Sequence, residues 1–113
     1  MTKLTTITVP CEKRKTRKMT GTVAILPIGK RKVRFLIERR EDGSVGALTH
    51  YASGYAFHRN LQALAVSFLV QHSVYHRQPS PRELAEAAIA DAVFAIGADK
   101  VLAKIYAAPV LNH

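Results

Sequence analysis

The dipeptide Asp42-Gly43 lies between two strand-like segments, and it is the feature that most constrains the fold. Asp-Gly favours a type I′ turn, whose central residues both need positive φ, and turns of this type join antiparallel strands. With Asp42 and Gly43 as the loop, the strands cover residues 33–38 and 45–51. The sequence therefore predicts an antiparallel hairpin in the middle of the chain.

The predicted turn also sets the register of this hairpin, because a two-residue loop determines which residues pair. The expected partners are Ile37 with Leu48, Phe35 with His50, and Leu36 with Thr49. One face of the hairpin then carries the apolar side chains Val33, Phe35, Ile37 and Leu48. The other face places Arg34 beside Tyr51, so that a cation lies next to an aromatic ring.

Two segments before the hairpin also have the composition of strands. Residues 4–9 are rich in threonine and branched side chains, and Pro10 is typical of a strand end. Residues 19–26 alternate between apolar and small or polar side chains, and we expect residues 27–30 to end this strand in a turn. The first half of the chain thus predicts a three- or four-stranded antiparallel sheet over about residues 3–52.

The second half of the chain has helical patterns instead. Asn60 precedes residues 61–75, whose apolar side chains form one stripe, so we expect this helix to lie on the sheet. Ser80-Pro81-Arg82-Glu83 has the pattern of a capping box and begins an alanine-rich helix over residues 81–96, which Gly97 ends. A last helix is expected over residues 99–107.

Together these patterns predict an α+β fold, in which C-terminal helices pack on one face of the sheet and leave the other face open. A length of 113 residues is typical of one domain, so we expect residues 1–113 to form a single unit. The alanine-rich helix is apolar over most of its circumference. It is expected to complete the core or to form the interface of a homodimer.

The charge of the chain is concentrated in its first half. The net charge is +9, from 17 Lys and Arg against 8 Asp and Glu. Residues 1–59 hold 13 basic and 4 acidic side chains, whereas residues 60–113 hold 4 of each. The chain therefore divides into a basic β-rich half and a neutral helical half. Its charge excludes an acidic mimic of nucleic acid, and an apolar fraction of 48% argues against a disordered chain.

The candidate binding residues are three groups of cations and one tyrosine. They are Lys13, Arg14, Lys15, Arg17 and Lys18; Lys30, Arg31, Lys32 and Arg34; Arg39 and Arg40; and Tyr51. If the strands pair in order, the second and third groups lie at opposite ends of one strand, and the first lies near the start of the preceding strand. Cations along a sheet can bind phosphates, because each neutralised phosphate releases counterions, and a tyrosine adds a surface for stacking.

These residues predict a nucleic-acid-binding accessory or regulatory protein that contacts the phosphates of DNA or RNA. The alternative is a protein-interaction module or inhibitor that uses the same cations to bind an acidic partner protein. A metal-independent ribonuclease is a third possibility, because His50 and His58 are general acid–base groups, but no spacing assigns them a catalytic role. The cations would otherwise serve only to keep strand edges solvated.

The remaining reactive side chains give weak signals. His72 and His76 stand four residues apart and could share a metal with His50 or His58, but the sequence has no His-Glu-x-x-His or Cys-x-x-Cys pattern. We therefore expect no metal and no cofactor. Cys11 is the only cysteine, so it forms no internal disulfide and favours a reducing compartment.

The apolar segments indicate neither a signal peptide nor a membrane span. No apolar run precedes the polar residues at 12–18, and the apolar-rich stretch at 61–74 is too short to cross a bilayer. We therefore expect a cytoplasmic protein without membrane contacts.

Overall fold

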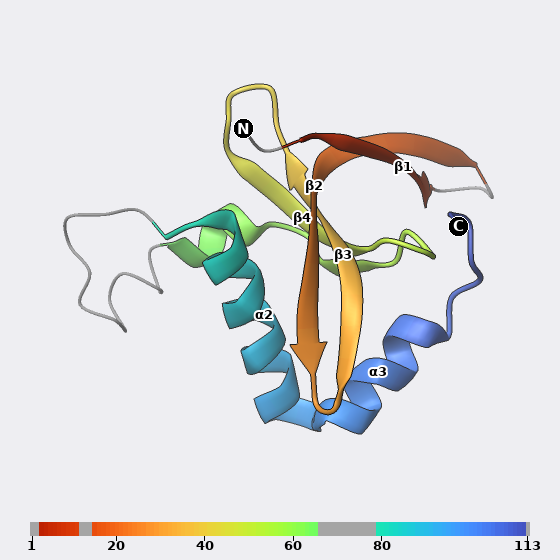
Figure 1. Cartoon of the computed structure of the whole chain (residues 1–113), viewed down its shortest axis with the longest axis vertical. Helices are drawn as coiled ribbons and strands as arrows, with labels where there is room; N and C mark the ends of the chain where they lie inside the picture. The colour runs from red at the N-terminus through yellow and green to blue at the C-terminus, as the bar shows by residue number, and fades with distance from the viewer. Residues whose placement is uncertain (1–2, 12–14, 66–78, 113) are drawn as a thin grey trace.

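The computed structural model describes residues 3–11, 15–65 and 79–112, and it shows an α+β fold built on a five-stranded antiparallel sheet (Figure 1). The strands are β1 (Thr5–Pro10), β2 (Thr16–Ile28), β3 (Arg31–Arg39), β4 (Val45–His50) and β5 (Ala56–His58). Each strand pairs with the next one along the chain, so the sheet is a meander. The predicted fold class is confirmed, with five strands rather than three or four.

The additional strand is β5, which lies beyond the residues of the predicted sheet. It is three residues long and pairs with β4 through Leu48 and His58. A strand of this length has too few residues to show an alternating pattern, so periodicity did not predict it.

Strand β2 is longer than predicted, because it begins at Thr16 and continues through Pro27 to Ile28. Pro27 pairs with Lys32 of β3, whereas β1 pairs with β2 only up to Gly21. Proline is tolerated at an edge, where its missing N–H leaves no hydrogen bond to a neighbouring strand unmade. The expectation that Pro27 ends the strand was therefore wrong.

The central hairpin has the predicted register but a different turn. Ile37 pairs with Leu48, as expected, and the flanking pairs agree. The N–H of Gly43 donates to the carbonyl of Arg40 at 2.9 Å, so Glu41 and Asp42 are the central residues of the turn, and Gly43 follows them at a φ of 88°. The type I′ turn was therefore a wrong prediction. A register shift between Ile37 and Arg39 compensates for the altered loop.

The two faces of the sheet bury separate apolar clusters. The larger cluster lies under the helices and includes Leu26, Ile28, Val33, Phe35, Ile37, Leu48, Leu61, Leu84, Ile89, Val101 and Ile105. The second cluster lies on the other face and contains Ile7, Val9, Met19, Leu36 and Ala47, with Tyr51 at its margin. Figure 1 shows β1 and the first part of β2 bending away from the hairpin. This bend covers part of the face that was expected to be open.

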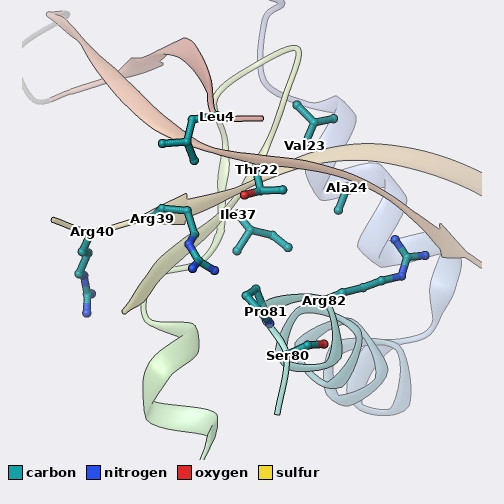
Figure 2. A pocket seen from close by; sticks show the side chains of 10 residues that line it. All are labelled: Leu4, Thr22, Val23, Ala24, Ile37, Arg39, Arg40, Ser80, Pro81 and Arg82. Atoms are coloured by element: carbon teal, nitrogen blue, oxygen red, sulfur yellow. The ribbon is translucent and has the colours of Figure 1, made fainter. Parts of the chain in front are cut away.

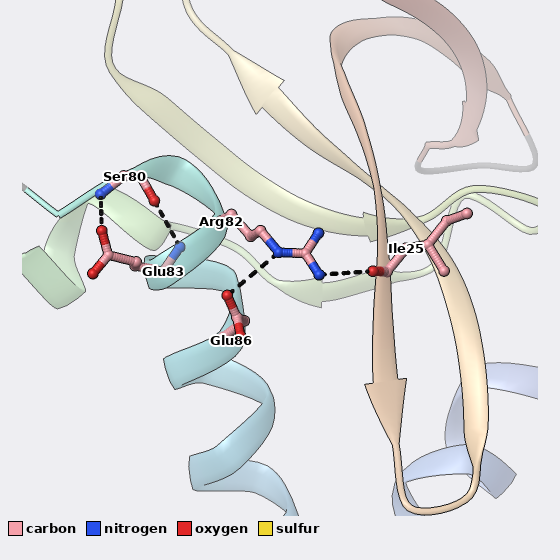
Figure 3. Close-up of polar contacts among 5 residues, drawn as sticks. All are labelled: Ile25, Ser80, Arg82, Glu83 and Glu86. Carbon is pink, nitrogen blue, oxygen red and sulfur yellow. Dashed lines mark hydrogen bonds and ion pairs between the residues drawn. The ribbon is translucent and has the colours of Figure 1, made fainter.

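In the described ranges, the helical elements that follow the sheet are the short 3-10 helix η2 (Leu61–Ala63), α2 (Pro81–Ile96) and α3 (Ala98–Tyr106). The helix expected over residues 61–75 thus begins as a 3-10 turn, and most of it lies outside the described residues. Helix α2 has the predicted capping box, in which the Glu83 N–H donates to Ser80 Oγ at 3.1 Å and the Ser80 N–H donates to Glu83 Oε1 at 3.0 Å (Figure 3).

The C-terminal residues join the first strand to the loop after β4. Asn112 Nδ2 donates to the carbonyls of Thr8 and Tyr51, at 2.8 Å and 2.9 Å, and Asn112 Oδ1 accepts from the Thr8 N–H at 2.9 Å. The backbone N–H groups of Leu111 and Asn112 both donate to the Ala52 carbonyl at 2.7 Å. This segment therefore connects the two sides of the curled sheet.

Candidate nucleic-acid interface

Arg34 and Tyr51 form a stacked pair on the side of the sheet that the helices do not cover. The guanidinium carbon of Arg34 lies 4.9 Å from the centre of the Tyr51 ring. The Tyr51 N–H also donates to the Arg34 carbonyl at 3.1 Å, so the backbone keeps the two residues opposite each other. The hairpin register predicted that Arg34 and Tyr51 lie next to each other, and this prediction is confirmed.

Other exposed side chains lie on the same side of the sheet as this pair. Ile25 pairs with Arg34 and Pro27 with Lys32, and paired residues share a face. Arg17 belongs to the same face, because it pairs with Val9, which is buried in the second cluster. We call this surface the helix-free face and define it by Arg17, Val23, Ile25, Lys32, Arg34 and Tyr51.

The alternation of the strands sends other candidate cations to different surfaces. Lys18 points to the opposite side of β2 from Arg17, and its Nζ donates to Thr8 Oγ1 at 2.8 Å. Arg31 stacks on Tyr106 of α3 at 4.9 Å, on the helix-covered side. Lys15 and Lys30 are exposed just outside the ends of β2. The three sequence groups therefore do not form one patch, and Lys13 and Arg14 lie outside the described residues.

Arg39 and Arg40 line a groove of about 660 Å³ between β2 and the start of α2 (Figure 2). The lining residues are Leu4, Thr22, Val23, Ala24, Ile37, Arg39, Arg40, Ser80, Pro81 and Arg82. Every charged residue among them is an arginine. Arg82 was not among the sequence candidates, because it stands 57 positions from its partner Ile25 and only the tertiary fold brings them together.

His50 belongs to the core rather than to an exposed site. It is 6% exposed, its Nδ1 lies 2.8 Å from Ser53 Oγ, and its ring contacts Phe35 and Tyr106 edge to face. Burial lowers the pKa of His50 below its ordinary value, because desolvation disfavours the charged imidazolium. His50 is therefore not the exposed acid–base group that the ribonuclease hypothesis requires.

The described residues contain no group of three metal-ligating side chains. His72 and His76 lie outside them, so the paired-histidine hypothesis has no structural description. Cys11 is an exposed thiol at the end of β1. Within the described ranges, no helix has the length and apolar character needed to cross a membrane.

Comparisons of the chain with protein-family models, with curated proteins and with solved structures found no significant match. Its function is therefore inferred from the two surfaces described above.

Proposed function

We propose that this chain is a nucleic-acid-binding accessory or regulatory protein that contacts phosphates through the helix-free face. The observation that carries this proposal is the Arg34–Tyr51 stack at 4.9 Å. Stacking orients the planar guanidinium while leaving N–H donors at its edge for a phosphate. Within the described part of the chain, no carboxylate lies within ion-pair distance of Arg34.

The surroundings of this pair supply both kinds of contact that nucleic acids use. Lys32 stands two residues before Arg34 on the same strand, so both cations project from the same face. Ile25 is 53% exposed next to Arg34, and the ring of Tyr51 is half-buried. A sheet that binds nucleic acid is expected to combine cations, which bind phosphates, with aromatic and apolar side chains, which contact the bases.

The test is a fluorescence-anisotropy titration with generic duplex and single-stranded oligonucleotides at two salt concentrations. We expect binding at low salt that weakens as salt increases, because neutralised phosphates release counterions. Replacing Lys32 and Arg34 together by Gln should weaken binding to all sequences and reduce the salt slope by about two.

The matched control replaces Lys100 and Lys104 of α3 by Gln, which removes the same charge from another element. This variant should keep the salt slope of the wild-type protein. Absence of binding to every oligonucleotide at low salt would overturn the proposal and leave the acidic partner protein as the alternative.

A further inference from the structure

The outer edge of β2 is unpaired along its second half in the described part of the chain. Strand β1 ends its pairing at Gly21, whereas β3 pairs with β2 from Gly21 to Ile28. The Ile25 carbonyl points away from β3, since it accepts a hydrogen bond from Arg82 Nη2 at 3.1 Å. Because backbone groups alternate in direction along an antiparallel strand, the Val23 N–H and C=O and the Ile25 N–H also point outward.

Two hollows border this edge on its helix side. The first is the arginine-lined groove beside Thr22 and Ala24. The second has a volume of about 270 Å³ and is mainly apolar; its lining is Leu26, Pro27, Ile28, Gly29, Glu86, Ile89, Ala90 and Val93. The two hollows thus lie along one strand, about four residues apart.

Arg82 crosses from α2 to β2 between the two hollows (Figure 3). Besides its bond to the Ile25 carbonyl, its Nε lies 3.5 Å from Glu86 Oε1. The side chain is 54% exposed, so solvent can reach both contacts. Arg82 therefore occupies the position from which an N–H of an added strand would donate to the Ile25 carbonyl.

We propose that the free edge of β2 binds an extended segment of a partner protein as an additional strand. The segment carries two apolar side chains four residues apart and an acidic side chain midway between them. Residues i, i+2 and i+4 of a strand share one face, so the apolar side chains enter the two hollows and the carboxylate meets Arg82. Backbone hydrogen bonds supply affinity in this mode, and the hollows supply specificity.

Charge favours an acidic segment over a basic one. All the charged residues that line the first hollow are arginines, and Arg39 is half-buried there. When a peptide N–H replaces Arg82 at the Ile25 carbonyl, the guanidinium becomes available to bind the central carboxylate in a forked ion pair. A nucleic acid has no row of backbone N–H donors for this edge, so strand addition is a different binding mode from phosphate binding, although Val23 and Ile25 border both surfaces.

The first experiment is a charge swap measured by anisotropy of a labelled peptide. The probe peptide contains Asp-Asp-Leu-Thr-Glu-Thr-Leu-Asp. In the comparison peptide, a lysine replaces the glutamate. We expect the wild-type protein to prefer the glutamate peptide by about tenfold and Arg82→Glu to reverse this preference. Lys104→Glu on α3 makes the same charge change elsewhere and should keep the wild-type preference.

Hydrogen exchange on the unchanged protein gives a second readout. Binding of the peptide should slow exchange at the Val23 and Ile25 amides, which point outward, and leave Ala24, which faces β3, unchanged. The proposal is wrong if neither peptide binds at up to about 1 mM, or if Arg82→Glu keeps the wild-type preference. It is also wrong if these amides gain protection from protein concentration alone, because the occupant is then a second copy of the chain.

This inference does not depend on nucleic-acid binding. The double variant Lys32→Gln, Arg34→Gln should bind the peptide as the wild-type protein does. The peptide and oligonucleotide titrations therefore succeed or fail separately.

Discussion

His50 shows how one side chain combines polar and apolar contacts in the core. Its Nδ1 lies 2.8 Å from Ser53 Oγ, and its ring contacts Tyr106 edge to face at 5.4 Å. The His50 carbonyl also accepts from the Gly54 N–H at 2.8 Å, which stabilises the turn after β4. His50 therefore joins β4, its turn and α3.

His50 should make the stability of the protein depend on pH. Desolvation holds its folded-state pKa below the ordinary 6.5, so the unfolded chain binds more protons as the pH falls. The stability associated with neutral His50 is present above pH 6.5 and is lost as the pH falls through the folded-state pKa. Urea unfolding of wild-type and His50→Gln proteins from about pH 7.5 to about pH 5.5 measures this loss.

Comparing the pH slopes of the two proteins isolates the contribution of His50, because both proteins contain the other histidines. We expect the free energy of unfolding to fall less steeply in His50→Gln. Equal slopes would show that His50 charges without cost in the folded state.

Contacts between residues on adjacent strands could be predicted from the sequence. The Arg34–Tyr51 neighbourhood follows from the alternation of two adjacent strands. The contact of Arg82 with Ile25 and that of Arg31 with Tyr106 require the placement of helices relative to the sheet. No periodicity within a single segment determines that placement, so these contacts were not predictable.

At the scale of elements, β2 is shared by two neighbours and bends between them. Gly21 pairs with Thr5 of β1 and with Glu38 of β3. The buried Met19 side chain lies on one face of β2, whereas the buried side chains from Ala24 onward lie on the opposite face. The close approach of β3 at Gly21 leaves no room for a side chain there.

Replacing Gly21 by Ala should destabilise the protein strongly. A Cβ would overlap the Ile37 carbonyl oxygen and lie 2.9 Å from Glu38 Cα, and these backbone atoms have little freedom to move. We expect a loss of roughly 3 kcal/mol in the free energy of unfolding, measured with urea.

Gly43→Ala is the control for this substitution. A Cβ at Gly43 meets nothing within 4 Å, and only its φ of 88° opposes the change. A loss of about 1 kcal/mol is expected. If Gly21→Ala costs no more than Gly43→Ala, the close packing of β2 on β3 does not limit this position.

The elements predicted correctly have strong local signals. The capping box of α2 satisfies backbone groups within four residues, and β3 is rich in branched and aromatic residues next to a turn signal. The end of β2 was missed because Pro27 breaks a strand only where its N–H would meet a neighbour. Whether that edge is free depends on the length of β1, which is a property of the whole sheet.

At the scale of the whole molecule, the two apolar clusters need different coverings. Helices α2 and α3 cover the larger cluster, and the bend of β1 and β2 covers the second. Nothing in the local sequence of residues 4–10 indicates that this strand will contact the C-terminal segment. The contact between Thr8 and Asn112 spans 104 positions, so it joins segments near the two ends of the chain.

Asn112→Ala should therefore open the side of the sheet where β1 meets the loop after β4. The substitution removes three hydrogen bonds and leaves the backbone groups of Thr8 and the Tyr51 carbonyl without these partners. We expect a loss of about 2 kcal/mol, because the groups are partly buried and only some of them regain water. Val110→Ala, at a side chain that is 55% exposed, should change stability little.

Hydrogen exchange locates the effect of Asn112→Ala within the fold. The Thr8 amide should exchange faster in the variant, whereas the Leu36 amide, inside the central hairpin, should keep its protection relative to global unfolding. This pattern would show that β1 opens as a local unit while the hairpin remains intact. Uniform acceleration at both amides would instead mean that closure by the C-terminal segment and the central sheet form one cooperative unit.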